Sequence, residues 1–237
     1  MTSNLKESCL TNGLKRCGIH ICVLGCIGAG KTTLCHAIQE HFHETGRPCA
    51  GFYEPVDDNP VLPLYYQDPE RYAFAMQIYM FNRRLRQQRD IQDDCRNGMN
   101  CVQDSSVFGD TCFVDMLCKD GIMSQVESDI YSDLFVNVGD RCMYPTLVVF
   151  LNCTPEVAME RIKKRNRGCE SGISFEYLAN LNYELKDLME SLKRFTHVKE
   201  IDYNQELNDS EIADVAKDVL ASAYEARNNP IISRMGL

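Results

Sequence analysis

Residues 25–32 read Gly-Cys-Ile-Gly-Ala-Gly-Lys-Thr and fit the pattern G-x-x-x-x-G-K-[ST] at every fixed position. The glycines at 28 and 30 allow a tight turn whose N–H groups point at phosphate oxygens. Lys31 adds a cation for the β- and γ-phosphates, and the Thr32 hydroxyl suits Mg²⁺. We therefore predict a site for a nucleoside triphosphate and Mg²⁺. Its nucleotide-binding residues are Gly25, Cys26, Ile27, Gly28, Ala29, Gly30, Lys31, Thr32 and Thr33.

The segments on either side of this motif match what a phosphate-binding loop requires. Residues 19–25 form an apolar, β-branched run typical of a buried strand. Residues 31–46 carry apolar side chains at helical spacing and end near Gly46, a plausible helix C-terminus. A strand before the loop and a helix after it favour a phosphate site over an incidental glycine turn. The loop alone does not choose between a GTPase, an ATPase and a kinase.

The rest of the chain alternates between predicted strands and helices. Strands are expected at 49–56, from 100 into a loop ending at 110, at 144–153 and at 197–204. Helices are expected at 68–95, at 111–140 as one or two pieces, at 154–168, 174–192 and 209–226. Asp68 before Pro69, and Thr154 before Pro155, are typical helix starts. This alternation predicts an α/β, three-layer P-loop NTPase fold with five parallel strands. We expect one domain over residues 19–237 and a flexible arm over residues 1–18.

Charge and cysteine content exclude several classes of protein. The net charge of −9 argues against a nucleic-acid partner, because phosphate neutralisation needs a basic surface. The 13 cysteines form no C-x-x-C, which predicts free thiols in a reducing compartment. The cysteines around the loop (Cys22, Cys26 and Cys35) are interpreted as small buried apolar residues. No signal peptide and no run of about 18 apolar residues is visible, so we expect no membrane span and a cytoplasmic location.

Three groups of polar residues are candidates for the acceptor side. Glu54 stands at the end of the second predicted strand, where ligands bind in parallel sheets, and a carboxylate there can take a proton from a hydroxyl. Gln77 and Arg84 are seven residues apart and share one helix face. Arg161, Arg165 and Arg167 make a basic cluster suited to phosphate oxygens. Taken singly, these residues also fit an exposed turn, an amphipathic helix face and a solvated helix end.

Several segments together resemble the deoxynucleoside kinase family. They are "GCIGAGKTT", "EPV", "PERYAFAMQ", "QDSSVFGD" and the arginine-rich loop before "FEYL". The resemblance covers about residues 19–203. It implies ATP-dependent phosphorylation of a deoxynucleoside 5′-hydroxyl. It also implies a homodimer or higher oligomer formed through long helices, with the helix around residues 115–135 and the one before it as candidates.

The resemblance implies roles for residues near the sugar and the phosphates. Glu54 matches the general base that acts on the 5′-hydroxyl. Tyr66 and Glu170 match residues that bind the 3′-hydroxyl. A lid of about residues 161–172 closes over the phosphates, and its arginines are Arg161, Arg165 and Arg167.

The resemblance also implies how the base is recognised. Gln77 and Asp110 match polar groups that contact the base edge, and Arg84 matches a helix arginine beside them. Phe81 and Phe108 match aromatic walls that hold the base. An arginine at position 84 together with Asp110 is similar to purine and cytosine users. The segment 103–110 resembles that of microbial deoxyadenosine and deoxyguanosine kinases, so we expect deoxyadenosine as the preferred substrate, followed by deoxyguanosine or deoxycytidine.

One position departs from the family pattern. The family has an acidic residue followed by arginine at the end of the third strand, and this chain has Asp104 and Ser105. Asp104 matches the acidic position and suits Mg²⁺. In the family this arginine orders the catalytic glutamate. Its absence here leaves three possibilities. Another cation (Arg83, Arg84 or a lid arginine) replaces it, the enzyme is weakened, or the sequence has been engineered at this position.

Two other functions remain open at this point. A nucleoside monophosphate kinase of the thymidylate type shares this fold and loop, but needs extra cations for the phosphate of its acceptor. A nucleotide-binding module with little catalysis is the second alternative, because Ser105 removes a family arginine.

Overall fold

The sheet has five strands, all parallel, in the order β2-β3-β1-β4-β5. This computed structural model describes residues 17–54, 59–139, 141–167, 170, 172–229 and 231. The strands are β1 (His20–Gly25), β2 (Cys49–Phe52), β3 (Asn100–Asp104), β4 (Leu147–Asn152) and β5 (His197–Asp202). The predicted α/β fold with five parallel strands is confirmed.

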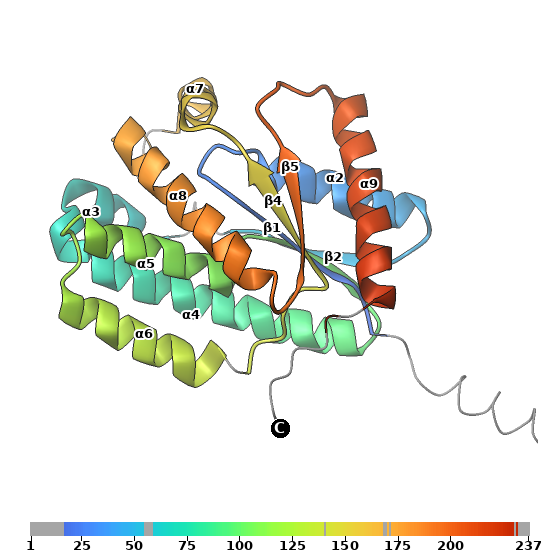
Figure 1. Cartoon of the computed structure of the whole chain (residues 1–237), viewed down its shortest axis with the longest axis horizontal. Helices are drawn as coiled ribbons and strands as arrows, with labels where there is room; N and C mark the ends of the chain where they lie inside the picture. The colour runs from blue at the N-terminus through green and yellow to red at the C-terminus, as the bar shows by residue number, and fades with distance from the viewer. Residues whose placement is uncertain are drawn as a thin grey trace, which may run out of the picture.

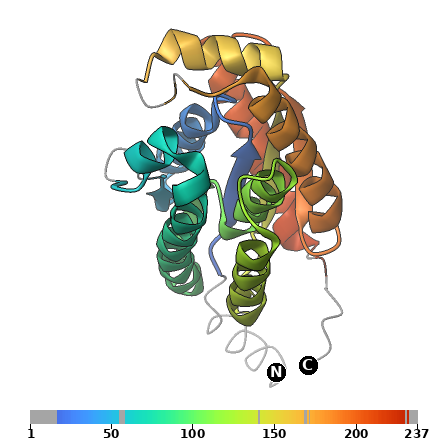
Figure 2. The same ribbon diagram turned by 90° about the vertical axis from the view of Figure 1, so that its left-hand side faces the viewer.

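Helices cover both faces of the sheet (Figures 1 and 2). On one face, α2 (Lys31–Glu44) packs beside α9 (Asp209–Asn228). The other face carries α4 (Pro69–Arg96), α5 (Asp110–Lys119) and α8 (Phe175–Leu192). The remaining helices are α3 (Leu62–Gln67) on α4, the one-turn η1 (Val107–Gly109) before α5, α6 (Gln125–Gly139) on α5, and α7 (Pro155–Arg165) on α8.

Double coverage explains why the central strands are almost wholly apolar. The side chains of β1 and β4 are buried along nearly their whole length. Strands of a parallel sheet with helices on both faces have no solvent face, so they need continuous apolar runs. The core therefore lies on both sides of β1, directly beneath the predicted phosphate loop.

Helix starts follow the predicted caps. The Asp68 carboxylate accepts a hydrogen bond from the Arg71 N–H at 3.3 Å, and Pro69 opens α4. The Thr154 hydroxyl accepts from the Val157 N–H at 3.4 Å before α7. Such caps satisfy N–H groups that have no partner within the helix. The segment 111–140 forms two helices, with Gly121 at φ 72° in the break.

Two features differ from the sequence prediction. Strand β2 ends at Phe52 instead of continuing to residue 56, so Glu54 stands in the loop that follows. The short helix α3 was not predicted, because six residues give too little periodicity to detect. Its start is fixed by the Asn59 side-chain oxygen, which accepts from the N–H groups of Val61 and Leu62. Most of the predicted arm, residues 1–16, lies outside the described residues.

The described cysteines are free, as predicted. Cys22, Cys26 and Cys35 are buried, and burial raises the pKa of the Cys22 thiol to about 12 and that of Cys26 to about 11. Neutral, buried thiols act here as small apolar side chains. None of the described helices combines the length and apolar character needed to cross a bilayer.

Candidate active site

The loop between β1 and α2 has the backbone that its glycines predict. Gly28 and Gly30 lie at φ 81° and 96°, in the region that favours glycine. A Cβ atom on Gly28 would meet the Ala158 carbonyl oxygen at 2.7 Å, so α7 also excludes a side chain there. The Lys31 ammonium lies inside the loop and donates to the carbonyls of Gly25 (3.0 Å) and Cys26 (2.9 Å). This is a cationic concavity at the start of a helix, the usual form of a phosphate site.

Thr32 and Asp104 meet at the edge of this loop. The Thr32 hydroxyl, in the first turn of α2, donates to Asp104 Oδ2 at the end of β3. Asp104 is buried, and within the described ranges its Oδ1 has no hydrogen-bond partner. A buried carboxylate oxygen beside a hydroxyl forms an all-oxygen donor set, which fits Mg²⁺. Among the described residues, no group of three or more His, Cys, Asp or Glu side chains forms a metal site of their own.

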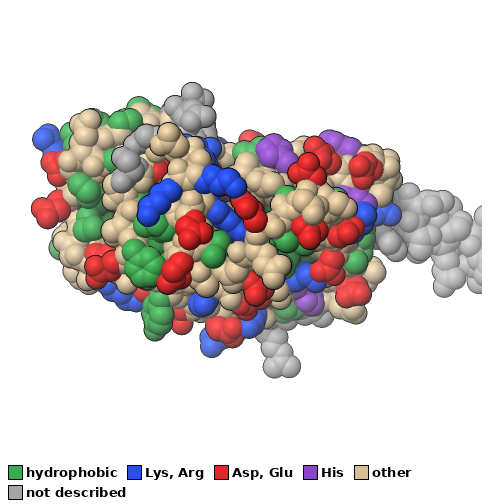
Figure 3. All heavy atoms as spheres, turned by 90° about the horizontal axis from the view of Figure 1, so that it is seen from above, with side chains coloured by type: hydrophobic (Ala, Val, Ile, Leu, Met, Phe, Trp, Pro, Cys, Tyr) green, Lys and Arg blue, Asp and Glu red, His purple; other side chains and the backbone are tan. Residues whose placement is uncertain are grey.

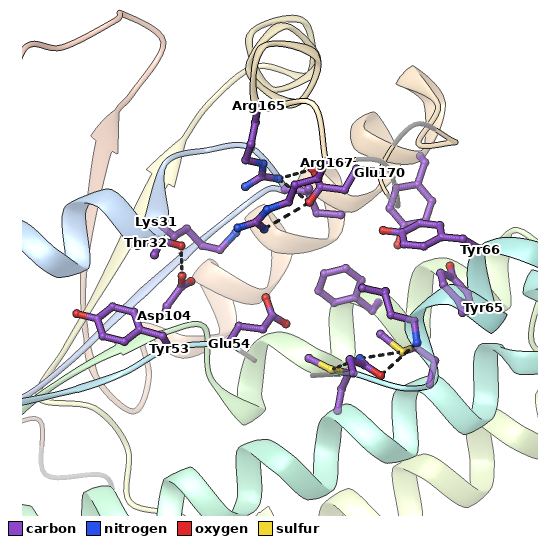
Figure 4. Close-up of a pocket in the computed structure, with 18 of the residues that line it drawn as sticks. Lys31, Thr32, Tyr53, Glu54, Tyr65, Tyr66, Asp104, Arg165, Arg167 and Glu170 are labelled. Carbon is purple, nitrogen blue, oxygen red and sulfur yellow. Dashed lines mark hydrogen bonds and ion pairs between the residues drawn. The ribbon is translucent and has the colours of Figure 1, made fainter. Parts of the chain in front are cut away.

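A cavity of about 210 Å³ opens beside the loop. One side is formed by Gly28, Lys31 and Thr32, and the opposite side by residues from α3 and α4. Glu54 points into the space between these two sides (Figure 4). The further predicted site residues in its lining are Ile27, Tyr66, Gln77, Asp104, Arg165, Arg167 and Glu170. The cavity therefore brings together predicted site residues from six separate segments of the chain.

Arg84 joins Glu54 to Asp110. Its Nη2 lies 2.6 Å from Glu54 Oε1, and its Nη1 contacts the carboxylate of Asp110. The Arg84 side chain is 7% exposed and that of Asp110 is fully buried, whereas that of Glu54 is 29% exposed. A buried guanidinium needs such partners, because an unpaired buried charge is strongly unfavourable. Arg84 and Asp110 lie behind the cavity and reach it through Glu54.

Two of the lid arginines, Arg165 and Arg167, converge on Glu170 (Figure 4). Arg165 Nη2 lies 2.6 Å from each oxygen of Glu170, and Arg167 Nη1 lies 3.7 Å from Oε1. Glu170 is 7% exposed, so this carboxylate is held firmly between charges. Of the predicted lid, residues 168, 169 and 171 lie outside the described residues.

A second hollow of about 280 Å³ adjoins the loop on the side of α9. Arg165 borders both hollows, and Arg161 borders this one. Arg161 donates to the Ala29 carbonyl (3.3 Å) and the Gln205 carbonyl (2.8 Å), so it ties α7 to the loop. The face seen from above, the side on which α7 lies in Figure 1, carries a group of Lys and Arg side chains (Figure 3).

The two predicted aromatic wall residues also lie outside the cavity lining. Phe81 packs against Tyr131 and Phe135 of α6, and Phe108 stacks on Tyr144 at a ring distance of 4.7 Å. Both phenylalanines are buried and neither lines the cavity. The expectation that they form its walls is corrected: they support the helices behind the wall.

Other side chains form that wall, and the sequence analysis missed them. They are Tyr53, Asn59, Leu62, Tyr65, Met76, Met80, Phe113 and Tyr177. Met76 and Met80 precede and follow Gln77 on the buried face of α4, and this spacing was the one available signal. Asn59 donates to the sulfur atoms of both methionines, at 3.5 Å and 3.4 Å.

A phosphate loop facing a carboxylate across a cavity is typical of a P-loop phosphotransferase. The family model described as "Deoxynucleoside kinase" matches residues 21–223. The chain belongs to the deoxynucleoside kinase family, and it is a kinase.

Known relatives agree with this assignment. A deoxyadenosine kinase of Dictyostelium discoideum is 35% identical over 200 residues, covering 84% of this chain and 78% of the relative. A deoxyadenosine kinase of Lactobacillus acidophilus is 37% identical over 159 residues, covering 64% and 69%. The structure of a deoxyadenosine kinase from M. mycoides with bound dCTP matches with a TM-score of 0.73 and 26% identity. That match covers 86% of this chain and 100% of the M. mycoides chain.

Proposed function

We propose that this kinase transfers the γ-phosphoryl group of ATP to the 5′-hydroxyl of a deoxynucleoside, with deoxyadenosine as the preferred acceptor. The observation that carries the proposal is the position of Glu54, which lines one cavity with Lys31 and Thr32. A carboxylate opposite a phosphate loop suits an acceptor that must lose a proton. The three similar proteins described above are deoxyadenosine kinases, which supports the choice of base.

In this proposal the sugar lies between Glu54 and the lid. Glu54 takes the 5′-hydroxyl proton as the oxygen attacks the γ-phosphorus in line. Tyr66 and Glu170 bind the 3′-hydroxyl, and Gln77 offers an amide that both donates and accepts at the base edge. Of these, Gln77 and Glu170 are buried in the lining of the cavity.

The remaining residues handle the phosphates. Lys31 and the loop N–H groups bind the β- and γ-phosphates, while Thr32 and Asp104 would hold Mg²⁺, which shields the charge of the triphosphate. Arg161, Arg165 and Arg167 stabilise the charge that spreads over the transferring group. Closure of the lid excludes water that would otherwise hydrolyse ATP.

We also propose that the chain acts as a homodimer through α6. Val126, Ile130 and Leu134 are 67%, 47% and 40% exposed, and their four-residue spacing aligns them on one helix face. An apolar stripe of this kind favours burial against a second copy. The free cysteines suit a reducing compartment, so we propose the cytoplasm as its location.

The test is a panel of acceptors with ATP and Mg²⁺. Product formation is measured for deoxyadenosine, deoxyguanosine, deoxycytidine and thymidine, and for the four corresponding monophosphates. We expect the highest kcat/KM with deoxyadenosine and the lowest with thymidine. Phosphorylation of a monophosphate but of no nucleoside would contradict the proposal and favour a thymidylate-type enzyme. A higher kcat/KM for thymidine than for the others would reject the base-contacting role of Arg84 and Asp110.

A further inference from the structure

We propose that Arg84 is the positioning residue for Glu54, and that it replaces the family arginine which Ser105 lacks. The inference rests on the proposed function, because it concerns how the general base is held. It assigns a second task to a residue that the family resemblance connects only with the base of the nucleoside.

The contact geometry supports this assignment. Arg84 Nη2 lies 2.6 Å from Glu54 Oε1, a distance typical of a strong charge-assisted hydrogen bond. Within the described ranges, Glu54 Oε2 has no hydrogen-bond partner and remains available to a substrate hydroxyl. One oxygen is thus fixed while the other faces the cavity, which is how a general base is oriented.

Arg84 is itself immobilised. It projects from the buried face of the 28-residue helix α4, and its other nitrogen contacts the buried Asp110 at the start of α5. A guanidinium has five donors in a planar arrangement, so one side chain can contact two carboxylates at once. The catalytic carboxylate is therefore connected to two helices by a single cation.

The lid arginines are engaged elsewhere. Arg165 and Arg167 pair with Glu170, and Arg161 donates to two backbone carbonyls. Among the described residues, Arg84 is the cation in contact with Glu54.

Ser105 offers no substitute of its own. It is 7% exposed and carries a short neutral side chain at φ 64°, where its N–H continues the sheet by donating to the Val23 carbonyl. A non-glycine residue already occupies this left-handed conformation, so a longer side chain is compatible with the backbone at position 105.

The inference predicts a link between base recognition and catalysis. Asp110, Arg84 and Glu54 form one continuous series of ion pairs, and the family resemblance connects the first two residues with the base. Removal of Arg84 should therefore lower kcat, in addition to raising KM for the nucleoside. A residue that only contacts the base would change KM alone.

The experiment compares kcat and KM between variants in which no buried charge is left without an ion-pair partner. R84M alone would leave the buried Asp110 carboxylate without its ion-pair partner, so the double variant R84M/D110N is used. Its reference is the single variant D110N. R86M, at an exposed position of the same helix, is the control. We expect R84M/D110N to have a kcat about 100-fold below that of D110N, at unchanged KM for ATP. Adding S105R to R84M/D110N should raise its kcat at least about tenfold, while the KM for deoxyadenosine stays high.

Two outcomes would overturn the inference. The first is that the kcat of R84M/D110N lies within about threefold of the kcat of D110N. The second is that adding S105R to R84M/D110N does not raise its kcat. If circular dichroism shows that R84M/D110N does not fold, the same comparison is made between R84K and R84K/S105R. A lysine keeps the charge beside Asp110, but its single ammonium does not match the two-carboxylate contact. Inactive wild-type protein would instead refute the proposed function, so the two failures are distinct.

Discussion

Glu54 stands two residues beyond the last strand residue of β2, with one oxygen on Arg84 and its side chain turned to the cavity. We expect E54Q to lower kcat by about 10²–10⁴-fold, because glutamine cannot take the hydroxyl proton. The Kd for ATP should stay within about twofold of wild type, since Lys31 and the loop are untouched. Single-turnover kinetics and ATP titration measure the two quantities. E190Q, at an exposed position of α8, is the control. Near-normal turnover by E54Q would exclude Glu54 as the base.

His20 has no part in the proposed chemistry and affects stability instead. It is fully buried in β1 with Nε2 3.1 Å from Gln103 Oε1, and burial lowers its pKa from 6.5 to about 4. Between these two pH values the unfolded chain binds one more proton at His20 than the native protein. The free energy of unfolding therefore falls as the pH is lowered from 6.5, by about 1.4 kcal/mol per pH unit for this group.

The variant H20Q tests this contribution. Glutamine cannot be protonated in this range and keeps a donor for Gln103. Urea unfolding at pH 7.5 and pH 5 should show a loss of stability in wild type that exceeds the loss in H20Q by about 2 kcal/mol. Equal losses in the two proteins would mean that His20 titrates normally in the folded state.

At the scale of elements, the phosphate loop and α7 are fitted to each other. Gly28 lies against the first turns of α7, where a Cβ would be 2.7 Å from the Ala158 carbonyl oxygen and 3.0 Å from Ile162 Cγ1. G28A should raise the Kd for ATP at least about tenfold and lower Tm, because both the φ of 81° and the contact with α7 oppose a side chain. Isothermal titration and thermal unfolding measure these effects.

The matched control is G139A in α6. A Cβ there meets only the Phe135 ring at 3.4 Å, and alanine favours the helix by about 0.5–1 kcal/mol. Its Tm should equal or exceed that of wild type. A normal ATP affinity in G28A would show that the loop can move away from α7.

The elements differ in how far the sequence predicts them. Strand β1 and helix α4 have local signals, a continuous apolar run and the Asp68-Pro69 start, and both form as predicted. Helix α3 has no such signal, because its start depends on Asn59 and its stability on packing against α4. Phe81 and Phe108 were predicted as cavity walls from resemblance, but helix α6 covers them, and no local pattern reports that contact.

At the scale of the whole molecule, the exposed stripe on α6 predicts association. Sedimentation of wild-type protein should give about twice the chain mass of 27.1 kDa. I130E places a charge in the middle of the stripe and should give a monomer that keeps its fold. K217E on α9, which lies on the opposite face of the sheet, is the control and should remain a dimer. A monomeric wild-type protein would contradict the proposed dimer. A dimeric I130E would show that the dimer contact does not lie on α6.

The site shows where sequence analysis stops. Lys31 and Thr32 were predicted because the whole phosphate loop lies within eight residues. The sequence does not decide which arginine contacts Glu54, because Arg84 is 30 positions away. Only the packing of α4 beside β3 brings Arg84 and Glu54 together. Contacts of this length depend on the complete fold, which short motifs do not encode.

The position of Arg165 bears on how this kinase treats ATP when no nucleoside is present. Arg165 is bonded to a glutamate of the acceptor cavity, although it also borders the hollow beside the phosphate loop. In the proposed mechanism Arg165 stabilises the transferring phosphoryl group, and its hydrogen bonds to Glu170 compete with that task. We expect a sugar hydroxyl that binds Glu170 to release the guanidinium, so that ATP hydrolysis is slow until both substrates are bound.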